Sequence, residues 1–229
     1  MTTSPKEPLP IAVLASGGGT NLQALLDTVH KHEVRIVAVA SNVPDAPALA
    51  RAQTHAVATA VFPRSAYPSR AARDTAMADW LRERGARLIV LAGYMQLIGE
   101  PFLDRFAGAV INVHPSLLPA FPGLHAVEQA LDYGVKVFGV TVHFVDAGVD
   151  SGPVILQGSI ALADACEARE VLAALRPLEH TLLPEAVRLF ATGRLRLDPA
   201  NPRRVLVAKG ASNSTSGDLR VGSDPADTL

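Results

Sequence analysis

Short apolar runs alternate with helix-like segments through the first half of the chain, and this alternation constrains the fold most strongly. The runs at residues 10–15, 34–41, 57–62 and 86–92 are mostly apolar and contain many β-branched residues. Strands of this kind are buried on both faces, as in parallel sheets whose crossover connections carry helices. Segments such as 20–32 place leucine and valine at helical spacing between the runs. The pattern predicts an α/β protein with a mostly parallel, twisted sheet and helices on both faces.

The second half of the chain has a different pattern, which predicts antiparallel strands added to this sheet. Residues 136–146 alternate between apolar side chains and small or polar ones, and strands are expected on either side, at 108–115 and 153–162. Helices are expected around 125–134, over 165–175 and over 178–192, with a kink or break at Pro184. A further short strand is expected near 203–210.

We expect one folded domain with short additions at both ends. The domain should cover residues 11–200, with a phosphate-binding half (11–100) and a catalytic half (101–200). Residues 1–10 are expected to be an N-terminal extension, and they lack the apolar core of a signal peptide. Residues 201–229 form a C-terminal tail rich in serine, aspartate and glycine, and we expect it to be partly mobile.

Charge and cysteine content limit the classes of function. The chain has 229 residues, of which 21 are basic and 22 acidic, and no basic cluster stands out. We therefore expect no nucleic-acid partner and no membrane partner. The single cysteine, Cys166, excludes an internal disulfide and suits a reducing compartment, so a cytoplasmic location is expected. The sequence leaves the oligomeric state open, with a homodimer as one alternative.

Three glycines, Gly17–Gly19, lie between the first strand and the first helix. Backbone N–H groups and the positive end of a helix can bind an anion at such a junction, and Thr20 and Asn21 add polar side chains. The dinucleotide motif G-x-G-x-x-G is not matched because Leu22 stands at the third glycine position. The loop suits a single phosphate, with a plain tight turn as the alternative.

Two polar residues interrupt the apolar strand at 108–115. Asn112 and His114 are two positions apart, so their side chains point to the same face near the carboxyl end of the strand. An amide and a protonated imidazole together can stabilise an oxyanion that develops on an attacked carbonyl group. Asp150, in a glycine-rich loop, could keep His114 charged and accept a proton through water. For each residue alone a structural role is the alternative, and spacing does not show that Asp150 reaches His114.

Two other histidines are candidates for supporting roles. His143 lies on the polar face of its expected strand, and His125 stands at the start of an expected helix, where it could line the pocket or cap the turn. The histidines are dispersed and form no H-x-x-x-H pair, and a single cysteine cannot form C-x-x-C, so no metal site is expected.

Several motifs give the chain a resemblance to the folate-dependent formyltransferase family. The main ones are INVHPSLLPAFPG at 111–123 and VDAGVDSGPVILQ at 145–157, the second preceded by GVTVHFV. SGGGTNLQALLD, ASN, LAGYMQLI and PGLHAVEQAL make the chain most similar to members that formylate glycinamide ribonucleotide. The resemblance runs from about Ile11 to Leu195 and implies a Rossmann-like formyltransferase fold.

The resemblance also implies roles for particular residues. Asn112, His114 and Asp150 match the catalytic trio, Gly19, Thr20 and Asn21 the loop that binds the substrate phosphate, and Glu179 a contact to the glycinamide and ribose end. The folate-binding residues implied are Arg70, Met95, Gln96, Leu97, Ile98, Asn112, Val145, Asp146, Ala147, Gly148, Val149 and Asp150. Gln96 stands where an arginine is familiar, and LRPLEH before Glu179 is a loose match.

The implied reaction is formyl transfer from the co-substrate 10-formyltetrahydrofolate to the primary amine of glycinamide ribonucleotide, without a metal. Three alternatives compete with it. A methionyl-tRNA formyltransferase would need an RNA-binding domain and a basic surface, and a formyltetrahydrofolate deformylase would have no reason for the phosphate loop. A non-catalytic folate- or nucleotide-binding module would leave the trio of Asn112, His114 and Asp150 unexplained.

Overall fold

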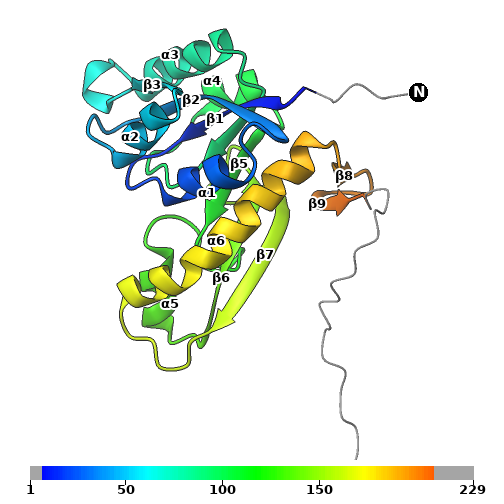
Figure 1. Ribbon diagram of the computed structural model, residues 1–229. Coiled ribbons are helices and arrows are strands. Elements are labelled where there is room, and N and C mark those ends of the chain that lie inside the picture. Colours follow the sequence, from blue (N-terminus) through cyan, green and yellow to red (C-terminus); the bar gives the residue numbers. More distant parts are fainter. Residues whose placement is uncertain (1–6, 209–229) are drawn as a thin grey trace, which may run out of the picture.

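The computed structural model describes residues 7–208, and within them nine strands form one sheet (Figure 1). The strand order is β3-β2-β1-β4-β5-β6-β7-β9-β8. The strands are β1 (Leu9–Leu14), β2 (Val34–Ser41), β3 (Ala58–Val61), β4 (Leu88–Leu91), β5 (Val110–His114), β6 (Val137–Phe144), β7 (Val154–Ala161), β8 (Leu195–Asp198) and β9 (Asn201–Val207).

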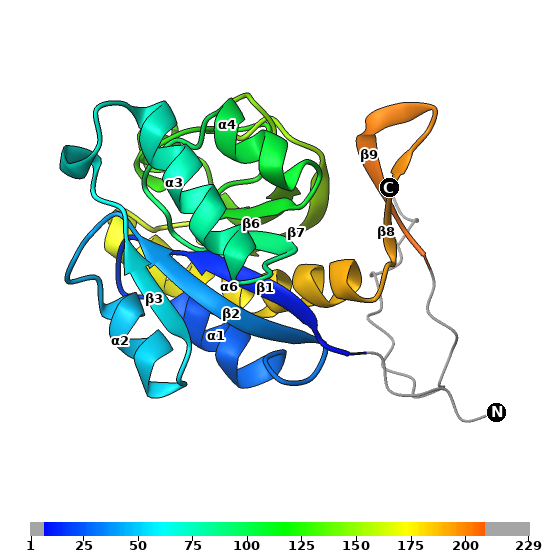
Figure 2. The ribbon, with the colours of Figure 1, turned by 90° about the horizontal axis from the view of Figure 1, so that it is seen from above.

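The first five strands are parallel, and β1, β2, β4 and β5 are largely buried on both faces, whereas the edge strand β3 is only partly buried. Alternate residues of each strand enter two separate cores: Ile11 and Val13 of β1 belong to one, Ala12 and Leu14 to the other. Figure 2 shows α1 (Thr20–Thr28) and α2 (Pro47–Thr54) on one side of this sheet. It shows α3 (Arg70–Glu83) and α4 (Glu100–Leu103) on the other. Helices therefore cover both faces, which confirms the predicted α/β fold.

Strand β5 is the boundary between the parallel and antiparallel parts of the sheet. It pairs parallel with β4 and antiparallel with β6, and β6 pairs antiparallel with β7. The apolar face of β6 enters the core through Phe138, Val140 and Val142. Its polar face, with Thr141 and His143, is also buried. Thr141 donates to the carbonyl oxygen of Ser116 at 2.7 Å, in the proline-rich loop after β5. The antiparallel addition predicted for the second half is confirmed.

One expectation about the helices is wrong. The helices predicted at 165–175 and 178–192 are a single 24-residue helix, α6 (Ala168–Ala191), which contains both Pro177 and Pro184. A proline removes one helical hydrogen bond, but the helix continues when burial of one face outweighs that loss. Leucines and valines along the whole length of α6 supply this burial: Val171, Leu175, Leu183 and Val187. Cys166 is exposed and lies just before the helix begins.

Strands β8 and β9 form a hairpin at the C-terminal end of the described range, and the sequence predicts only one of the two. Strand β9 matches the strand expected near 203–210, whereas β8 was not predicted. Figure 2 shows this hairpin at one end of the sheet, where β9 pairs with β7 through Val154 and Arg204. Residues 1–6 of the expected extension and 209–229 of the expected tail lie outside the described residues.

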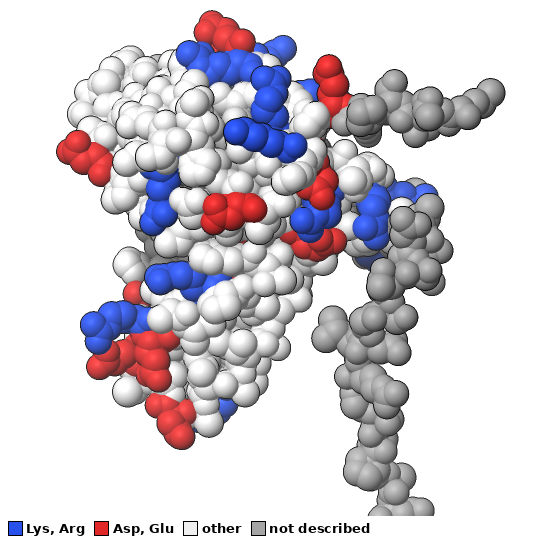
Figure 3. Space-filling view, in the orientation of Figure 1, with Lys and Arg blue, Asp and Glu red and all other residues white. Residues whose placement is uncertain are grey.

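Charges of both signs are spread over the face seen in Figure 3, and several basic side chains lie close together at its top. Among residues 7–208, no helix is long and apolar enough to cross a membrane. The same residues contain no cluster of three or more His, Cys, Asp or Glu side chains that could hold a metal ion.

The buried face of α6 yields a prediction about stability. Leu175, two positions before Pro177, is fully buried, whereas Leu172 on the same helix is 41% exposed. Leu175→Ala should lower the free energy of unfolding by about 2–5 kcal/mol, because it leaves a cavity in the core. Leu172→Ala should lower it by less than about 1 kcal/mol. Urea unfolding followed by circular dichroism measures both, and equal losses would contradict the packing of Leu175 in the core.

Candidate active site

Strand β5 presents Asn112 and His114 on one face, beside His143 of β6. In the β5–β6 register Asn112 lies opposite His143, and His114 lies opposite Thr141. The side chains of all four residues therefore share the same face of the sheet. His114 and His143 are almost fully buried. This polar cluster stands at the edge of the parallel part of the sheet, near the carboxyl end of β5.

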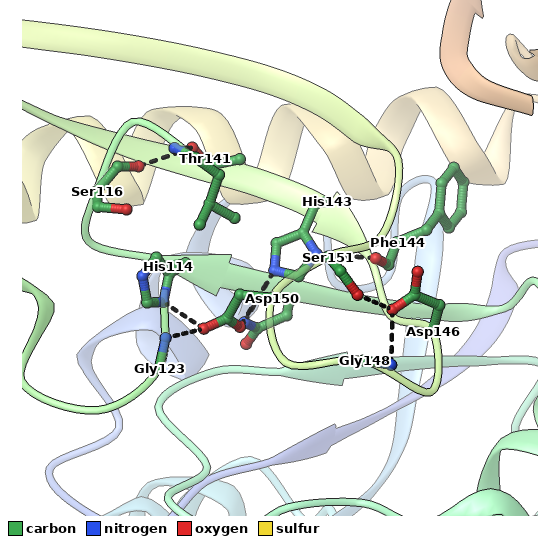
Figure 4. A network of polar contacts seen from close by, with 12 residues as sticks. His114, Ser116, Gly123, Thr141, His143, Phe144, Asp146, Gly148, Asp150 and Ser151 are labelled. Carbon is green, nitrogen blue, oxygen red and sulfur yellow. Dashed lines mark hydrogen bonds and ion pairs between the residues drawn. The ribbon is translucent and has the colours of Figure 1, made fainter. Parts of the chain in front are cut away.

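Asp150 joins this cluster from the loop between β6 and β7 (Figure 4). Its Oδ2 atom lies 3.3 Å from Nδ1 of His114 and accepts a hydrogen bond from the backbone N–H of Gly123 at 2.7 Å. Its Oδ1 atom lies 3.4 Å from Nδ2 of Asn112 and 3.7 Å from Nε2 of His143. The fold thus brings Asp150 to both residues, although the sequence separation gave no indication of this contact.

The backbone of Asp150 has a φ angle of 48°, in the left-handed region that non-glycine residues adopt at a cost. Aspartate is among the residues that tolerate this region best, and the Gly123 N–H fixes its side chain. Next to it, Asp146 accepts hydrogen bonds from the hydroxyl group of Ser151 at 2.6 Å and the backbone N–H of Gly148 at 3.1 Å. The loop is therefore held by its own hydrogen bonds in the shape that delivers Asp150.

The surroundings of Asp150 favour its charged form. Burial alone would raise the pKa of the Asp150 carboxyl group. The hydrogen bond from the N–H of Gly123 and the positive charge of His114 oppose this effect, and the pKa lies below its usual value. Asp150 is therefore a carboxylate at neutral pH.

Both ring nitrogens of His114 have oxygen atoms next to them. Nδ1 faces Asp150, and Nε2 lies 2.9 Å from the carbonyl oxygen of Phe121. A neutral imidazole has one N–H and can donate to only one of the two, whereas the protonated ring donates to both. The contacts of His114 thus fit an imidazolium ion paired with the Asp150 carboxylate.

His143 orients the side-chain amide of Asn112. Its Nδ1 atom lies 2.8 Å from the carbonyl oxygen of Phe144, and its Nε2 atom lies 3.1 Å from Nδ2 of Asn112. When Nδ1 donates to Phe144, Nε2 can accept one of the two amide protons of Asn112. The second amide proton then has only the long 3.4 Å contact to Asp150.

The cluster forms one wall of a cavity of about 380 Å³. Met95, Gln96, Leu97 and Ile98 line the same cavity from the loop after β4, and His125 lines it from the start of α5 (Ala126–Tyr133). Of the implied folate-binding residues in the loop after β6, Val145, Asp146, Gly148 and Val149 also line it. Arg70 and Ala147 do not. Lining residues that were not named from the sequence include Tyr94, Leu124 and Ser151.

Arg70 and Ala147 line a second cavity of about 410 Å³ instead. Leu97, Ile98, Gly148 and Val149 line both cavities, so these residues form the boundary between them. The implied folate-binding residues are thus distributed over two adjoining cavities, with Arg70 in the one away from Asn112 and His114.

The glycine loop leads directly into α1. Gly19 precedes the helix with a φ angle of 70°, and a Cβ atom there would lie 2.7 Å from Cα of Ala48. Only glycine fits at this position. Arg51, which the sequence interpretation missed, donates from Nε to the carbonyl oxygen of Gly18 at 2.8 Å. A side chain in the middle of a helix gave no sequence signal for this contact.

Asn21 faces α6 rather than the glycine loop. Its Nδ2 atom donates to Oε2 of Glu179 at 3.0 Å, while its buried Oδ1 atom has no hydrogen-bond partner among the described residues. Burial raises the pKa of the Glu179 carboxyl group, although the Asn21 hydrogen bond and the charge of Arg176 oppose this shift. Asn21 and Glu179 are thus in direct contact, while Gly19 and Thr20 remain at the start of the helix.

Ser16 connects the glycine loop to the cavity that Asn112 and His114 line. Its hydroxyl group accepts a hydrogen bond from the backbone N–H of Met95 at 2.8 Å and donates to Oδ1 of Asn42 at 2.5 Å. Its own N–H donates to the carbonyl oxygen of Gly93. The loop proposed for phosphate binding therefore begins beside a wall of the cavity that contains Asn112.

Comparison with known proteins agrees with this architecture. The family model described as "Formyl transferase" matches residues 9–187. The chain belongs to the formyl transferase family. It is 41% identical to the phosphoribosylglycinamide formyltransferase of Haemophilus influenzae, over 82% of this chain and 89% of that protein. It is 38% identical to that of Escherichia coli K12, over the same shares of the two chains.

Solved structures of the family have the same fold. Glycinamide ribonucleotide transformylase 1 from Symbiobacterium toebii superposes with a TM-score of 0.85 and 44% identity, over 90% of this chain and all of that one. A formyltetrahydrofolate deformylase from Pseudomonas syringae has a TM-score of 0.80 at 24% identity, over 90% of this chain and 68% of that one. Because only 24% of the residues are identical, the similarity to this deformylase shows a shared fold and says nothing about function.

The raised pKa of Glu179 predicts how this residue affects stability. A carboxyl group whose pKa is higher in the folded protein than in the unfolded chain destabilises the fold once pH exceeds the unfolded value. Glu179→Gln keeps an acceptor for Asn21 but removes the charge. The variant should therefore unfold at a higher urea concentration than the original protein at pH 7. The difference should shrink as pH falls toward the ordinary pKa of glutamate.

Urea unfolding at several pH values from 4 to 8 measures this difference, and Glu185→Gln on the same helix is the control. Glu185 is 40% exposed and pairs with Arg188 at 2.6 Å, so removing its charge should not stabilise the protein. A Glu179→Gln variant that is less stable than the original protein at pH 7 would contradict the conclusion that burial raises the pKa of Glu179.

Proposed function

We propose that this protein transfers the formyl group of 10-formyltetrahydrofolate to the amine of glycinamide ribonucleotide, in purine biosynthesis. The products are formylglycinamide ribonucleotide and tetrahydrofolate. The observation that carries the proposal is the contact of Asp150 with both His114 and Asn112 at the wall of a large cavity. It is supported by identities of 41% and 38% to two phosphoribosylglycinamide formyltransferases.

In the proposed reaction, the neutral amine of the nucleotide attacks the formyl carbon. The carbon becomes tetrahedral and its oxygen becomes an oxyanion, which needs hydrogen-bond donors and nearby positive charge. Asn112 is the donor most readily available, because its second amide proton has only the 3.4 Å contact to Asp150. His143 holds the other amide proton and so keeps the amide turned in this direction.

We assign to His114 a mainly electrostatic role. Its Nε2 atom is held by Phe121 at 2.9 Å, so the positive charge of the ring and the Nδ1–H, shared between Asp150 and the oxyanion, supply the stabilisation. Asp150 keeps the ring protonated. As the tetrahedral intermediate collapses, the attacking nitrogen loses a proton and the folate nitrogen gains one. We propose that Asp150 relays this proton through water.

Substrate binding follows from the same arrangement. We propose that the cavity of about 380 Å³ holds the ring system of the folate, and that the adjoining cavity with Arg70 holds its glutamate tail. The glycine loop, with Gly19 and Thr20 at the positive end of α1, would bind the nucleotide phosphate. Asn21 and Glu179 would contact the glycinamide and ribose part of that substrate.

The test supplies purified protein with 10-formyltetrahydrofolate, with and without glycinamide ribonucleotide, and follows the release of tetrahydrofolate by absorbance. We expect release that depends on the nucleotide. Asn112→Ala should lower kcat by about 10²–10³, as loss of one oxyanion donor does in other enzymes. Gln53→Ala, which removes an exposed amide side chain of α2, is the control and should keep normal turnover.

Three outcomes would contradict the proposal. Tetrahydrofolate release that is independent of the nucleotide would indicate a hydrolase that deformylates the folate. Ligand binding without any turnover would indicate a binding module. Normal turnover by a correctly folded Asn112→Ala variant would remove Asn112 from the mechanism.

A further inference from the structure

Arg73 and Asp74 form a buried ion pair outside the catalytic cluster. The two residues are consecutive on α3, and their side chains are 1% and 0% exposed. The guanidinium group of Arg73 donates twice to Oδ1 of Asp74, from Nε at 3.1 Å and from Nη2 at 2.7 Å. Burying two charges in this way is costly unless their remaining hydrogen-bonding groups are also satisfied.

The remaining groups of the pair all bind one loop, the segment 95–99 between β4 and α4. Arg73 donates from Nη1 to Oε1 of Gln96 and from Nη2 to the carbonyl oxygen of Leu97, each at 3.1 Å. Oδ2 of Asp74 accepts the backbone N–H of Gly99 at 2.8 Å. The two side chains therefore hold the loop at three positions within four residues.

Loop 95–99 is the segment that most needs such support. It contains neither helix nor strand, so its backbone polar groups depend on partners elsewhere. At its other end the N–H of Met95 binds Ser16. Figure 2 shows α3 and α4 next to each other on the face of the sheet opposite α1 and α2. The loop leads into α4, whose first turn begins after Gly99.

The position of this loop determines the shape of both cavities. Residues 95–98 line the cavity with Asn112 and His114, residues 97–99 line the cavity with Arg70, and Leu97 and Ile98 line both. Gln96 is also the residue at which the chain departs from the arginine familiar in the family. In this chain residue 96 is a glutamine, and it accepts a hydrogen bond from the guanidinium group of Arg73, which lies on α3.

We propose that Arg73 and Asp74 are positioning residues for the folate-binding pocket, and that they hold loop 95–99 in the shape that accepts the folate ring system. The inference rests on the proposed function for the identity of the ligand. Neither side chain lines the Asn112 cavity, and Asp74, but not Arg73, lines the adjoining cavity with Arg70. Loss of the pair's contacts should therefore weaken folate binding and leave binding of the nucleotide unchanged.

Arg73→Lys is the most informative variant. A lysine ammonium group can keep the ion pair with Asp74, but it cannot replace the separate N–H groups that reach Gln96 and Leu97. We expect the Kd for tetrahydrofolate, measured by anaerobic calorimetry, to rise about tenfold. The Kd for glycinamide ribonucleotide should stay the same, and amide hydrogen exchange in residues 95–99 should become faster.

The matched control is Arg105→Lys. Arg105 also binds a carboxylate of α3, that of Asp79 at 2.8 Å, and it donates to the carbonyl oxygen of Pro101 at 2.7 Å. This pair is 29% and 52% exposed and binds no residue of loop 95–99. Arg105→Lys should leave both Kd values and the exchange of the loop unchanged. If Arg73→Lys does not fold, Asp74→Asn, which keeps an acceptor for the N–H of Gly99 but weakens the ion pair, should change the same two quantities in the same direction.

An unchanged Kd for tetrahydrofolate in a variant with faster loop exchange would overturn the inference. So would an equal loss of affinity for both ligands, which would indicate a general structural role. If the original protein binds tetrahydrofolate but transfers no formyl group, the proposed function fails, and the comparison of Kd values still decides the inference. If the original protein does not bind tetrahydrofolate, both are wrong.

Discussion

The contacts of the Asp150 carboxylate determine how the rest of the site is arranged. One oxygen is fixed by the backbone of Gly123 and faces His114, and the other faces Asn112 and His143. These partners come from β5, from the proline-rich loop after it and from β6. The buried carboxylate stays ionised because the N–H of Gly123 donates to it and the charge of His114 lies beside it. A single buried negative charge thus connects three separate segments.

The sheet topology explains why this cluster forms at β5. The strand is the last of the parallel series and the first with an antiparallel neighbour. Its parallel side places it beside β4 and the loop that lines the cavity, while its antiparallel side places Asn112 opposite His143. The glycine loop after β1 reaches the same region through Ser16 and Met95. Two substrates could therefore meet where three strand ends are close together.

Patterns local in sequence predicted most of the fold, whereas contacts between distant segments were not predictable. Apolar runs identified the parallel strands, and a spacing of two placed Asn112 and His114 on one face. No spacing rule links Asp150 to His114 or Asn21 to Glu179, because the path of the intervening chain decides both contacts. Arg73 has the sequence context of an exposed helical residue, and its burial depends on Asp74 and the loop beside it. The break expected at Pro184 is absent because core packing keeps α6 continuous.

The central claim is that Asp150 and His114 act together as one unit, and a double-mutant cycle tests it most directly. The measurement is kcat/KM for nucleotide-dependent formyl transfer in the original protein, Asp150→Asn, His114→Ala and the variant with both changes. If the two residues act as a unit, the double variant should be about as slow as the slower single variant. If the two losses instead multiply, Asp150 and His114 contribute separately, and the claim is wrong.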